Sequence, residues 1–275
     1  MGNLNRLARA VAGFFLPSHC LACARRPVDG FFQGGVCESC WEAVPMPVRP
    51  SCERCAEPLS TSDAAFCGRC LLDPPEFRML RAAAPYRGVA REILLAFKFR
   101  GADYLAPHLA RLLAARLAGQ SDYDEITAVP ATARQRLRRD HAADLLGAAL
   151  ARELALPFAP ERLEKVRATM RQSDLPLGQR AENVRGAFRA TRPAPERILL
   201  VDDVATSGST ARSCARALLR AGAETVDVWC FARAGREDDI FPTRPSSPEK
   251  DPREPQADDS STLAPRIPTT ADRNR

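Results

Sequence analysis

Two adjacent aspartates and a run of small hydroxyl residues follow an apolar stretch in the last third of the sequence. Asp202 and Asp203 come directly after residues 198–201 (Ile-Leu-Leu-Val), and residues 204–210 read Val-Ala-Thr-Ser-Gly-Ser-Thr. Ionised carboxylates accept hydrogen bonds only, so an adjacent pair suits a ligand that presents two hydroxyl groups. Backbone N–H groups and hydroxyls at the start of a helix form a site for an anion. The segment therefore predicts a site for a sugar phosphate, with the sugar ring beside the aspartates.

Other interpretations account for less of this segment. It lacks the G-x4-G-K-[ST] pattern of loops that bind nucleoside triphosphates. A phosphoaspartyl enzyme would need a different spacing after the aspartate. The segment could also be a strand, a solvated turn and a capped helix that bind no ligand. That interpretation leaves unexplained why acids, a glycine and hydroxyls follow the strand together.

Eight of the ten cysteines lie within residues 1–80, in four C-x2-C pairs. The pairs are Cys20/Cys23, Cys37/Cys40, Cys52/Cys55 and Cys67/Cys70. Two residues between thiolates let both sulfurs reach one ion, and four thiolates complete a tetrahedral zinc site. One or two zinc ions are expected, either joining consecutive pairs or joining the first pair with the third and the second with the fourth. Because four thiolates leave no open coordination position, the zinc is expected to be structural.

A disulfide framework is the alternative for these cysteines. It needs an oxidising compartment, and residues 1–20 lack the long apolar core and cleavage site of an export signal. Residues 1–80 are also poor in apolar residues, so the metal would have to stabilise them. We expect chelation, or the Cys37→Ser change, to unfold residues 1–80. His19, beside Cys20, is either a spare ligand or a loop residue.

Hydrophobic periodicity places these motifs on alternating helices and strands. Helices are predicted at residues 87–97, 105–117, 142–154 and 210–221, and strands at residues 125–130, 197–201 and 225–231. A strand, a helix and a second strand in that order form a right-handed crossover, which makes the sheet parallel. The fold class is therefore α/β, a parallel sheet flanked by helices, with a small N-terminal cysteine-rich module.

Composition divides the chain into three regions. Residues 1–80 hold the cysteine pairs, and residues 81–235 hold the periodic segments. Residues 236–275 are expected to be disordered because they have too few apolar residues to form a core. Residues 4–15 predict a short amphipathic helix. No run of about 20 apolar residues occurs, so we expect no membrane span and a cytoplasmic protein.

Basic residues are numerous, but nearly all are arginines. Of the 40 basic residues only Lys98, Lys165 and Lys250 are lysines, and the formal net charge is +6. This excess suits an anionic ligand or a nucleic acid, and equally a solvated basic surface. No basic run interleaved with aromatic residues occurs, so charge alone gives little support to nucleic-acid binding.

The loop segment resembles the signature of type I phosphoribosyltransferases, which is an apolar strand, two acids and a T-[ST]-G-x-T loop. More narrowly, the sequence resembles the ComF family of competence-associated proteins. The first block that carries this likeness is the predicted N-terminal helix followed by Leu-Pro-Ser-His-Cys-Leu-Ala-Cys and the further cysteine pairs, and the second is the loop. The third block consists of Arg167, Thr169, Gln172, Leu175, Arg180, Asn183 and residues 186–188. Residues 86–88 and 95–101 fit as well.

The resemblance implies a role for each part of the site. Asp202 and Asp203 would hold the ribose hydroxyls of phosphoribosyl diphosphate, and Mg²⁺ would bridge ribose and diphosphate oxygens. Residues 165–188 would form a flexible arm, from which Arg167 and Arg180 either close over the anion or only solubilise the arm. The 5-phosphate would lie on Ala205, Thr206, Ser207, Gly208, Ser209 and Thr210.

The segment after residues 129–130 would be the diphosphate loop, and here the sequence departs from the family. It reads Ala-Thr-Ala-Arg-Gln-Arg-Leu-Arg-Arg-Asp-His where the family has an Arg-Gly-x-Asn-Gln-like stretch, which Asp140 and His141 would only partly replace. Four arginines keep positive charge there or begin a solvated helix, namely Arg134, Arg136, Arg138 and Arg139.

A few reactive side chains lie outside these motifs. Lys98, in a Phe-Lys-Phe-Arg-Gly segment, is expected to contact the diphosphate or a carboxylate. Cys214 and Cys230 are interpreted as small core residues. His108 and His141 show no ligand partners in the sequence.

Two functions agree with these patterns. The first is a Mg²⁺-dependent phosphoribosyl transfer, in which C1 of the sugar is attacked after the diphosphate leaves. The second is a non-catalytic module that senses phosphoribosyl diphosphate or handles single-stranded DNA, while the zinc module docks a partner. The resemblance implies a role in DNA uptake and natural competence, with competence and recombination proteins as partners. The sequence identifies no acceptor and no general base.

Overall fold

The computed structural model describes residues 19–28, 35–117, 119, 122–131, 141–167 and 183–235. All of these belong to one compact unit of the chain, Met1–Ile240. The predicted N-terminal helix and the predicted disordered tail lie outside the described residues. In the described part of the chain, every helix is too short or too polar to cross a membrane.

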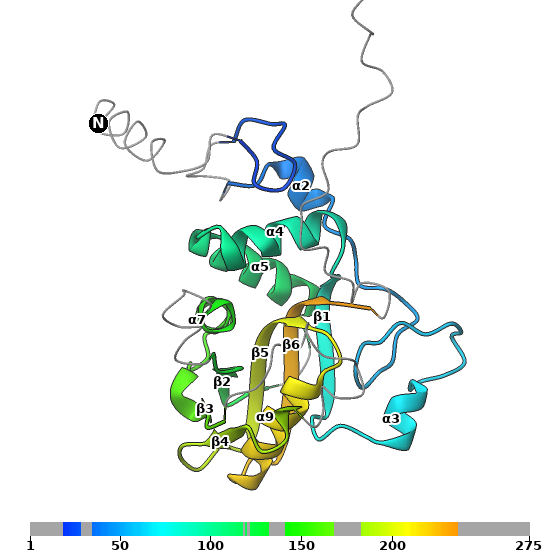
Figure 1. Ribbon diagram of the computed structural model, residues 1–275, viewed down its shortest axis with the longest axis vertical. Coiled ribbons are helices and arrows are strands. Elements are labelled where there is room, and N and C mark those ends of the chain that lie inside the picture. The colour runs from blue at the N-terminus through cyan, green and yellow to red at the C-terminus, as the bar shows by residue number, and fades with distance from the viewer. Residues whose placement is uncertain are drawn as a thin grey trace, which may run out of the picture. The chain divides into compact units, whose positions relative to one another are not determined.

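Four parallel strands form the central sheet, in the order β1-β6-β5-β2 (Figure 1). They are β1 (Met79–Pro85), β2 (Glu125–Ala128), β5 (Arg197–Ala205) and β6 (Thr225–Arg233). The predicted parallel sheet is therefore confirmed. β5 extends beyond the predicted strand and pairs with β6 as far as Ala205 opposite Arg233. Asp202 and Asp203 thus lie within the strand, close to its carboxyl end, and not after it.

β1 is a strand that the sequence patterns do not predict. Its sequence is Met-Leu-Arg-Ala-Ala-Ala-Pro, and alanine favours helices over strands. The structure places it beside β6 at one edge of the sheet and buries most of its residues, from Leu80 with 0% exposure to Ala84 with 1%. Packing in the folded protein therefore overrides the local preference of the alanines.

Helices cover both faces of the sheet (Figure 1). On one face lie α4 (Gly88–Phe99), α5 (Ala106–Leu117) and α7 (Ala142–Leu154), and on the other lies α9 (Ser209–Arg220). Successive strand residues point to opposite faces, so Leu199 and Val201 pack with the first group of helices. Ile198 and Leu200 pack with α9 for the same reason. The predicted helices are confirmed with small shifts of their ends.

Short elements complete the described chain. A two-stranded antiparallel hairpin of β3 (Leu163–Lys165) and β4 (Phe188–Ala190) packs on the α9 side. Two 3-10 turns, Asp103–Leu105 and Pro160–Arg162, precede α5 and β3. Two five-residue helices, α2 (Glu38–Glu42) and α3 (Gly68–Leu72), begin directly after Cys37 and Cys67. Figure 1 shows α2 and α3 at separate places, α2 next to α4.

Candidate functional site

The turn from β5 into α9 runs through Thr206, Ser207 and Gly208. Gly208 has a φ of 77°, in the left-handed region that glycine adopts without steric cost. The hydroxyls of Ser207 and Ser209 lie 2.9 Å apart, and the Ser209 N–H donates to Ser207 Oγ at 3.3 Å. Gly208 has no side chain with which to cap the helix. Hydroxyls and first-turn N–H groups therefore share one turn, the arrangement that binds anions at helix N-termini.

The two aspartates lie just before this turn. Asp202 Oδ1 accepts a hydrogen bond from the Asp203 N–H at 2.9 Å, and Asp203 Oδ1 accepts one from the Val204 N–H at 2.6 Å. The other oxygen of Asp203, Oδ2, lies 2.8 Å from Lys98 Nζ. Because α4 packs on the face of the sheet to which Asp203 points, it brings Lys98 to the carboxylate. Of the two contacts expected for Lys98, the structure shows the one with a carboxylate.

Charge is concentrated around these carboxylates. Burial, followed by the charge of Asp203, raises the pKa of Asp202 well above its usual range, while Lys98 opposes the rise. Tyr86 is buried just after β1, and its burial raises its pKa in an environment that includes Lys98 and Asp203. The sequence patterns assign no role to Tyr86 beyond the family likeness of residues 86–88. Hydroxyl donors or a cation beside either carboxylate would relieve this repulsion.

The other residues expected to bind anions are only partly described. Arg167 Nη2 donates to the carbonyls of Asn183 and Arg185 at 2.9 and 2.8 Å, so Arg167 joins the two ends of the expected arm. β3 and β4 form the base of that arm. Arg180 lies outside the described residues, and so do four arginines of the expected diphosphate loop, Arg134, Arg136, Arg138 and Arg139.

The remaining reactive side chains have structural surroundings. Cys214 and Cys230 are fully buried, as the sequence predicts, and burial raises the pKa of Cys230 to about 12. The ring of His108 stacks on Trp41 with 5.8 Å between the ring centroids. Burial lowers the pKa of His108. His141 is the residue that precedes α7.

The eight paired cysteines form two separate clusters. The first cysteine site consists of Cys20, Cys23, Cys37 and Cys40, and the second cysteine site consists of Cys52, Cys55, Cys67 and Cys70. Within each site the sulfur atoms all lie within 4.8 Å of one another, close enough to bind one tetrahedral zinc ion. The structure therefore joins consecutive pairs, excludes the crossed arrangement and provides two sites for structural zinc. His19 forms an isolated bridge with Pro27 and belongs to neither cluster.

The two cysteine sites have similar backbones. In each site the second cysteine is followed by an alanine with positive φ, 56° at Ala24 and 55° at Ala56. The N–H of each alanine donates to the carbonyl of the first cysteine, at 2.8 Å to Cys20 and 2.9 Å to Cys52. Burial opposes ionisation of Cys37, but hydrogen bonds from Ser39 and Cys40 outweigh it and lower its pKa to about 6. In the same cluster, burial and the neighbouring thiols raise the pKa of Cys40, and a bound zinc ion would favour the thiolate form of both cysteines.

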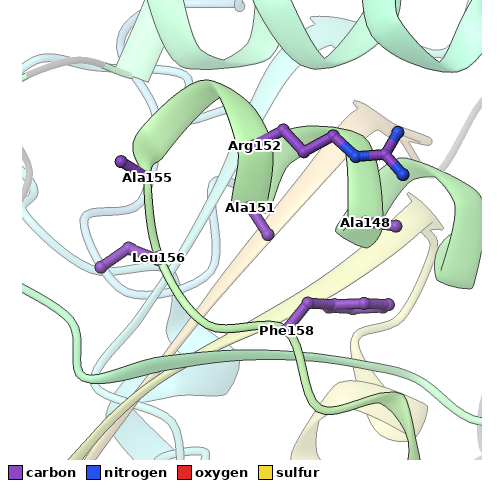
Figure 2. Close-up of a pocket in the computed structure, with 6 residues that line it drawn as sticks. All are labelled: Ala148, Ala151, Arg152, Ala155, Leu156 and Phe158. Atoms are coloured by element: carbon purple, nitrogen blue, oxygen red, sulfur yellow. The ribbon is translucent and has the colours of Figure 1, made fainter.

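An open apolar hollow lies at the C-terminal end of α7, where Figure 2 shows the ring of Phe158 beneath the last helical turn. Phe158 forms a bridge to Ile126, which is level with Leu199 near the amino end of β5. The hollow is therefore remote from the aspartates along the strand. It contains none of the expected site residues and is lined by Ala148, Ala151, Arg152, Ala155, Leu156 and Phe158.

A parallel α/β sheet that carries two acids and a hydroxyl-rich turn at the end of β5, preceded by two four-cysteine sites, defines a type I phosphoribosyltransferase-like fold with an N-terminal zinc module. The double zinc ribbon domain family matches residues 11–71. DNA utilization protein YhgH of Salmonella typhimurium is 35% identical over 226 residues, which make up 79% of this chain and 98% of that protein. Competence protein F of Haemophilus influenzae is 30% identical over 213 residues, 74% of this chain and 92% of that protein.

These similarities show that the chain belongs to the ComF family. Among solved structures, glutamine phosphoribosylpyrophosphate amidotransferase from B. subtilis covers 47% of this chain, and the overlap is 26% of that chain, with 23% identity and a TM-score of 0.34. The strand order, the two cysteine sites and membership of the ComF family together indicate the fold.

Proposed function

We propose that the chain binds phosphoribosyl diphosphate with Mg²⁺ at the β5–α9 turn and transfers its phosphoribosyl group. The observation that supports this most is the arrangement at the carboxyl end of β5, where the Asp203–Lys98 pair at 2.8 Å precedes a glycine turn into α9. Asp202 and Asp203 would accept hydrogen bonds from the ribose hydroxyls. Residues 205–210 would hold the 5-phosphate. Mg²⁺, when bound, would neutralise charge on the departing diphosphate.

The setting that we propose is the use of DNA taken up by the cell. The relatives are named for DNA utilization and for competence, and the net charge of +6 suits a partner that carries phosphates. In this proposal residues 81–235 bind the sugar phosphate in the cytoplasm. Residues 1–80 hold the zinc and contact single-stranded DNA or a competence or recombination protein.

Calorimetry of the full chain with phosphoribosyl diphosphate and Mg²⁺ tests ligand binding. We expect saturable binding by the wild type and a loss of about tenfold in affinity for Asp203→Asn, because a charged hydrogen bond contributes about 1.5–3 kcal/mol. Asp122→Asn is the matched control, since it removes the same charge from a side chain that is 94% exposed near β2. No binding by the wild type would reject the proposal. Equal losses in both variants would reject the assigned site.

Transfer is tested separately from binding. Release of diphosphate in the presence of a panel of nucleobases would support the enzyme. Binding without release would favour the alternative, a non-catalytic sensor of phosphoribosyl diphosphate. Salt-dependent binding of single-stranded DNA, measured on the same preparation, would support the DNA-handling part of the proposal.

A further inference from the structure

Arg233, the last residue of β6, is a buried arginine with 6% exposure that contacts both the β5–α9 turn and the second cysteine site. Its Nη1 donates to the carbonyls of Thr206 and, at 3.2 Å, Ala205. Its Nε donates to the carbonyl of Cys55 at 3.1 Å, and its Nη2 lies 2.6 Å from Glu57 Oε2. One guanidinium therefore holds the backbone of the turn on one side and the backbone of the zinc site on the other.

A second arginine makes the same connection from the other half of the site. Arg69 lies between the ligands Cys67 and Cys70, and its Nη1 donates to the carbonyl of Ser207 at 3.2 Å. Each cysteine pair of the second site is thus linked to the turn. The start of α9 is also held, because Arg212 donates to Asp73 and Glu76 in the segment just after this site.

These contacts fix the direction of backbone N–H groups. In a planar trans peptide the C=O and the following N–H point in opposite directions, and the three peptide bonds from Ala205 to Gly208 are trans. The carbonyl of Ala205 also accepts the Ala234 N–H at 2.9 Å, so the arginines act mainly on the carbonyls of Thr206 and Ser207. They therefore turn the N–H groups of Ser207 and Gly208 away from the zinc site. Successive N–H groups aligned in this way form a concave site for an anion.

The first cysteine site has no comparable connection among the described residues. Its backbone contacts go to the helices on the other face, since Arg116 of α5 donates to the carbonyls of Val44 and Pro45 at 2.8 and 2.7 Å. Arg100, directly after α4, donates to the carbonyl of Leu21 at 3.3 Å. The link to the turn is therefore a property of the second site and not of zinc sites in general.

We propose that Arg233 and Arg69 are positioning residues through which the second zinc site orients the β5–α9 turn for the phosphate group of a sugar phosphate. The proposal rests on the proposed function, because it assigns a further role at the same ligand site. It makes the affinity for phosphate depend on the second cysteine site, and it gives the two zinc ions different tasks.

The test is calorimetry of the full chain with ribose 5-phosphate, which probes the turn without the diphosphate. Arg233→Lys keeps the charge, but a single ammonium cannot reach acceptors on both sides, so we expect affinity to fall by about tenfold. Arg69→Ala changes an exposed residue and should lower affinity by about threefold without harm to folding. Arg116→Lys is the matched control, because it weakens the same kind of contact at the first site and should leave affinity unchanged.

Two further readouts separate positioning from general stability. Zinc content should stay at two ions per chain in all variants, and amide hydrogen exchange at residues 206–208 should quicken in Arg233→Lys and Arg69→Ala but not in Arg116→Lys. Wild-type affinity in both Arg233→Lys and Arg69→Ala would overturn this inference and leave the proposed function standing. Absence of ribose 5-phosphate and phosphoribosyl diphosphate binding in the wild type would overturn both.

Discussion

The two cysteine sites share one local design but contact different parts of the molecule. Three ligands of the first site, Cys20, Cys37 and Cys40, belong to the same buried cluster as α4, α5 and α7. The second site lies at the margin of the other cluster, where Cys55 and Ala56 are only partly buried. Its polar contacts go to the edge strand β1, where the Leu80 N–H donates to the carbonyl of Arg54 at 2.7 Å, and to the β5–α9 turn through Arg233 and Arg69.

This difference indicates that two similar metal sites in one chain serve different needs. The first site contributes three buried cysteines to the core that lies under α4, α5 and α7. The second site contributes less apolar burial but fixes the backbone beside the expected ligand. Loss of the first should therefore reduce stability most, and loss of the second should reduce ligand affinity most.

The largest effect is expected at the first site. Cys37→Ser removes a ligand that is 5% exposed, and structural zinc provides on the order of 10 kcal/mol of apparent binding energy. We expect loss of one zinc ion, rapid proteolysis within residues 1–80 and a fall of several kcal/mol in the free energy of unfolding. The equivalent second-site change, Cys67→Ser, is the comparison. A smaller loss of stability in Cys37→Ser than in Cys67→Ser would contradict the assignment of tasks.

A smaller effect is expected where the first site meets α5. Arg116→Met removes the donor to the carbonyls of Val44, Pro45 and Ala83, and unsatisfied part-buried acceptors cost about 1–3 kcal/mol each. We expect the free energy of unfolding to fall by about 3 kcal/mol in urea titrations, the lower end of that range for three acceptors. Arg100→Met, at an exposed side chain, should cost less than about 1 kcal/mol. Equal losses of unfolding free energy in Arg116→Met and Arg100→Met would contradict the claim that the more buried contact contributes more.

A contact near the second site should matter less for stability. Glu76 accepts hydrogen bonds from Arg212 at 2.7 Å and from Arg216 at 2.8 Å, and its side chain is 23% exposed. Glu76→Gln should lower the free energy of unfolding by about 1 kcal/mol. Glu164→Gln, which weakens an exposed pair with Arg189 in the hairpin, is the control and should have almost no effect. A larger loss of unfolding free energy in Glu76→Gln than in Arg116→Met would contradict the claim that contacts of the first site contribute more to stability.

The smallest effect concerns pH at the first site. Burial and, secondarily, Arg111 lower the pKa of His108 from 6.5, so the unfolded chain binds a proton more readily than the folded chain. Stability should therefore fall as the pH drops below 6.5 toward the pKa of the folded state. In His108→Gln, stability should no longer fall over this pH range. Thermal unfolding of both proteins at several pH values checks this, with zinc content measured at each pH. The same pH profile in both proteins would contradict this account.

Local patterns were enough to predict the parts of the fold that depend on local sequence. The four C-x2-C pairs, the β5–α9 segment and α7 each carry their signal within about a dozen residues. Cysteine spacing could not decide which pairs share an ion, because that depends on how the turns meet in space. β1 could not be predicted because a run of alanines favours a helix, and it is the packing beside β6 that makes this segment a strand.

Arg233 shows why part of the candidate site could not be predicted. It is one of 40 basic residues and ends an apolar strand, where an arginine is usually a solvated charge. Its partners Cys55 and Thr206 come from distant parts of the sequence. Lys98 stands out in the sequence because lysine is rare in this chain, and the structure places its ammonium group beside Asp203.

The most direct test of the central claim is to follow the backbone N–H signals of the turn by NMR while ribose 5-phosphate is added to the labelled full chain. If the second zinc site orients this turn for phosphate, the signals of Ser207 and Gly208 should shift saturably in the wild type, and the shifts should be much weaker in Arg233→Lys. Signals around the first cysteine site should stay in place. Saturable shifts that leave Ser207 and Gly208 unchanged, or that are the same in Arg233→Lys, would contradict the account.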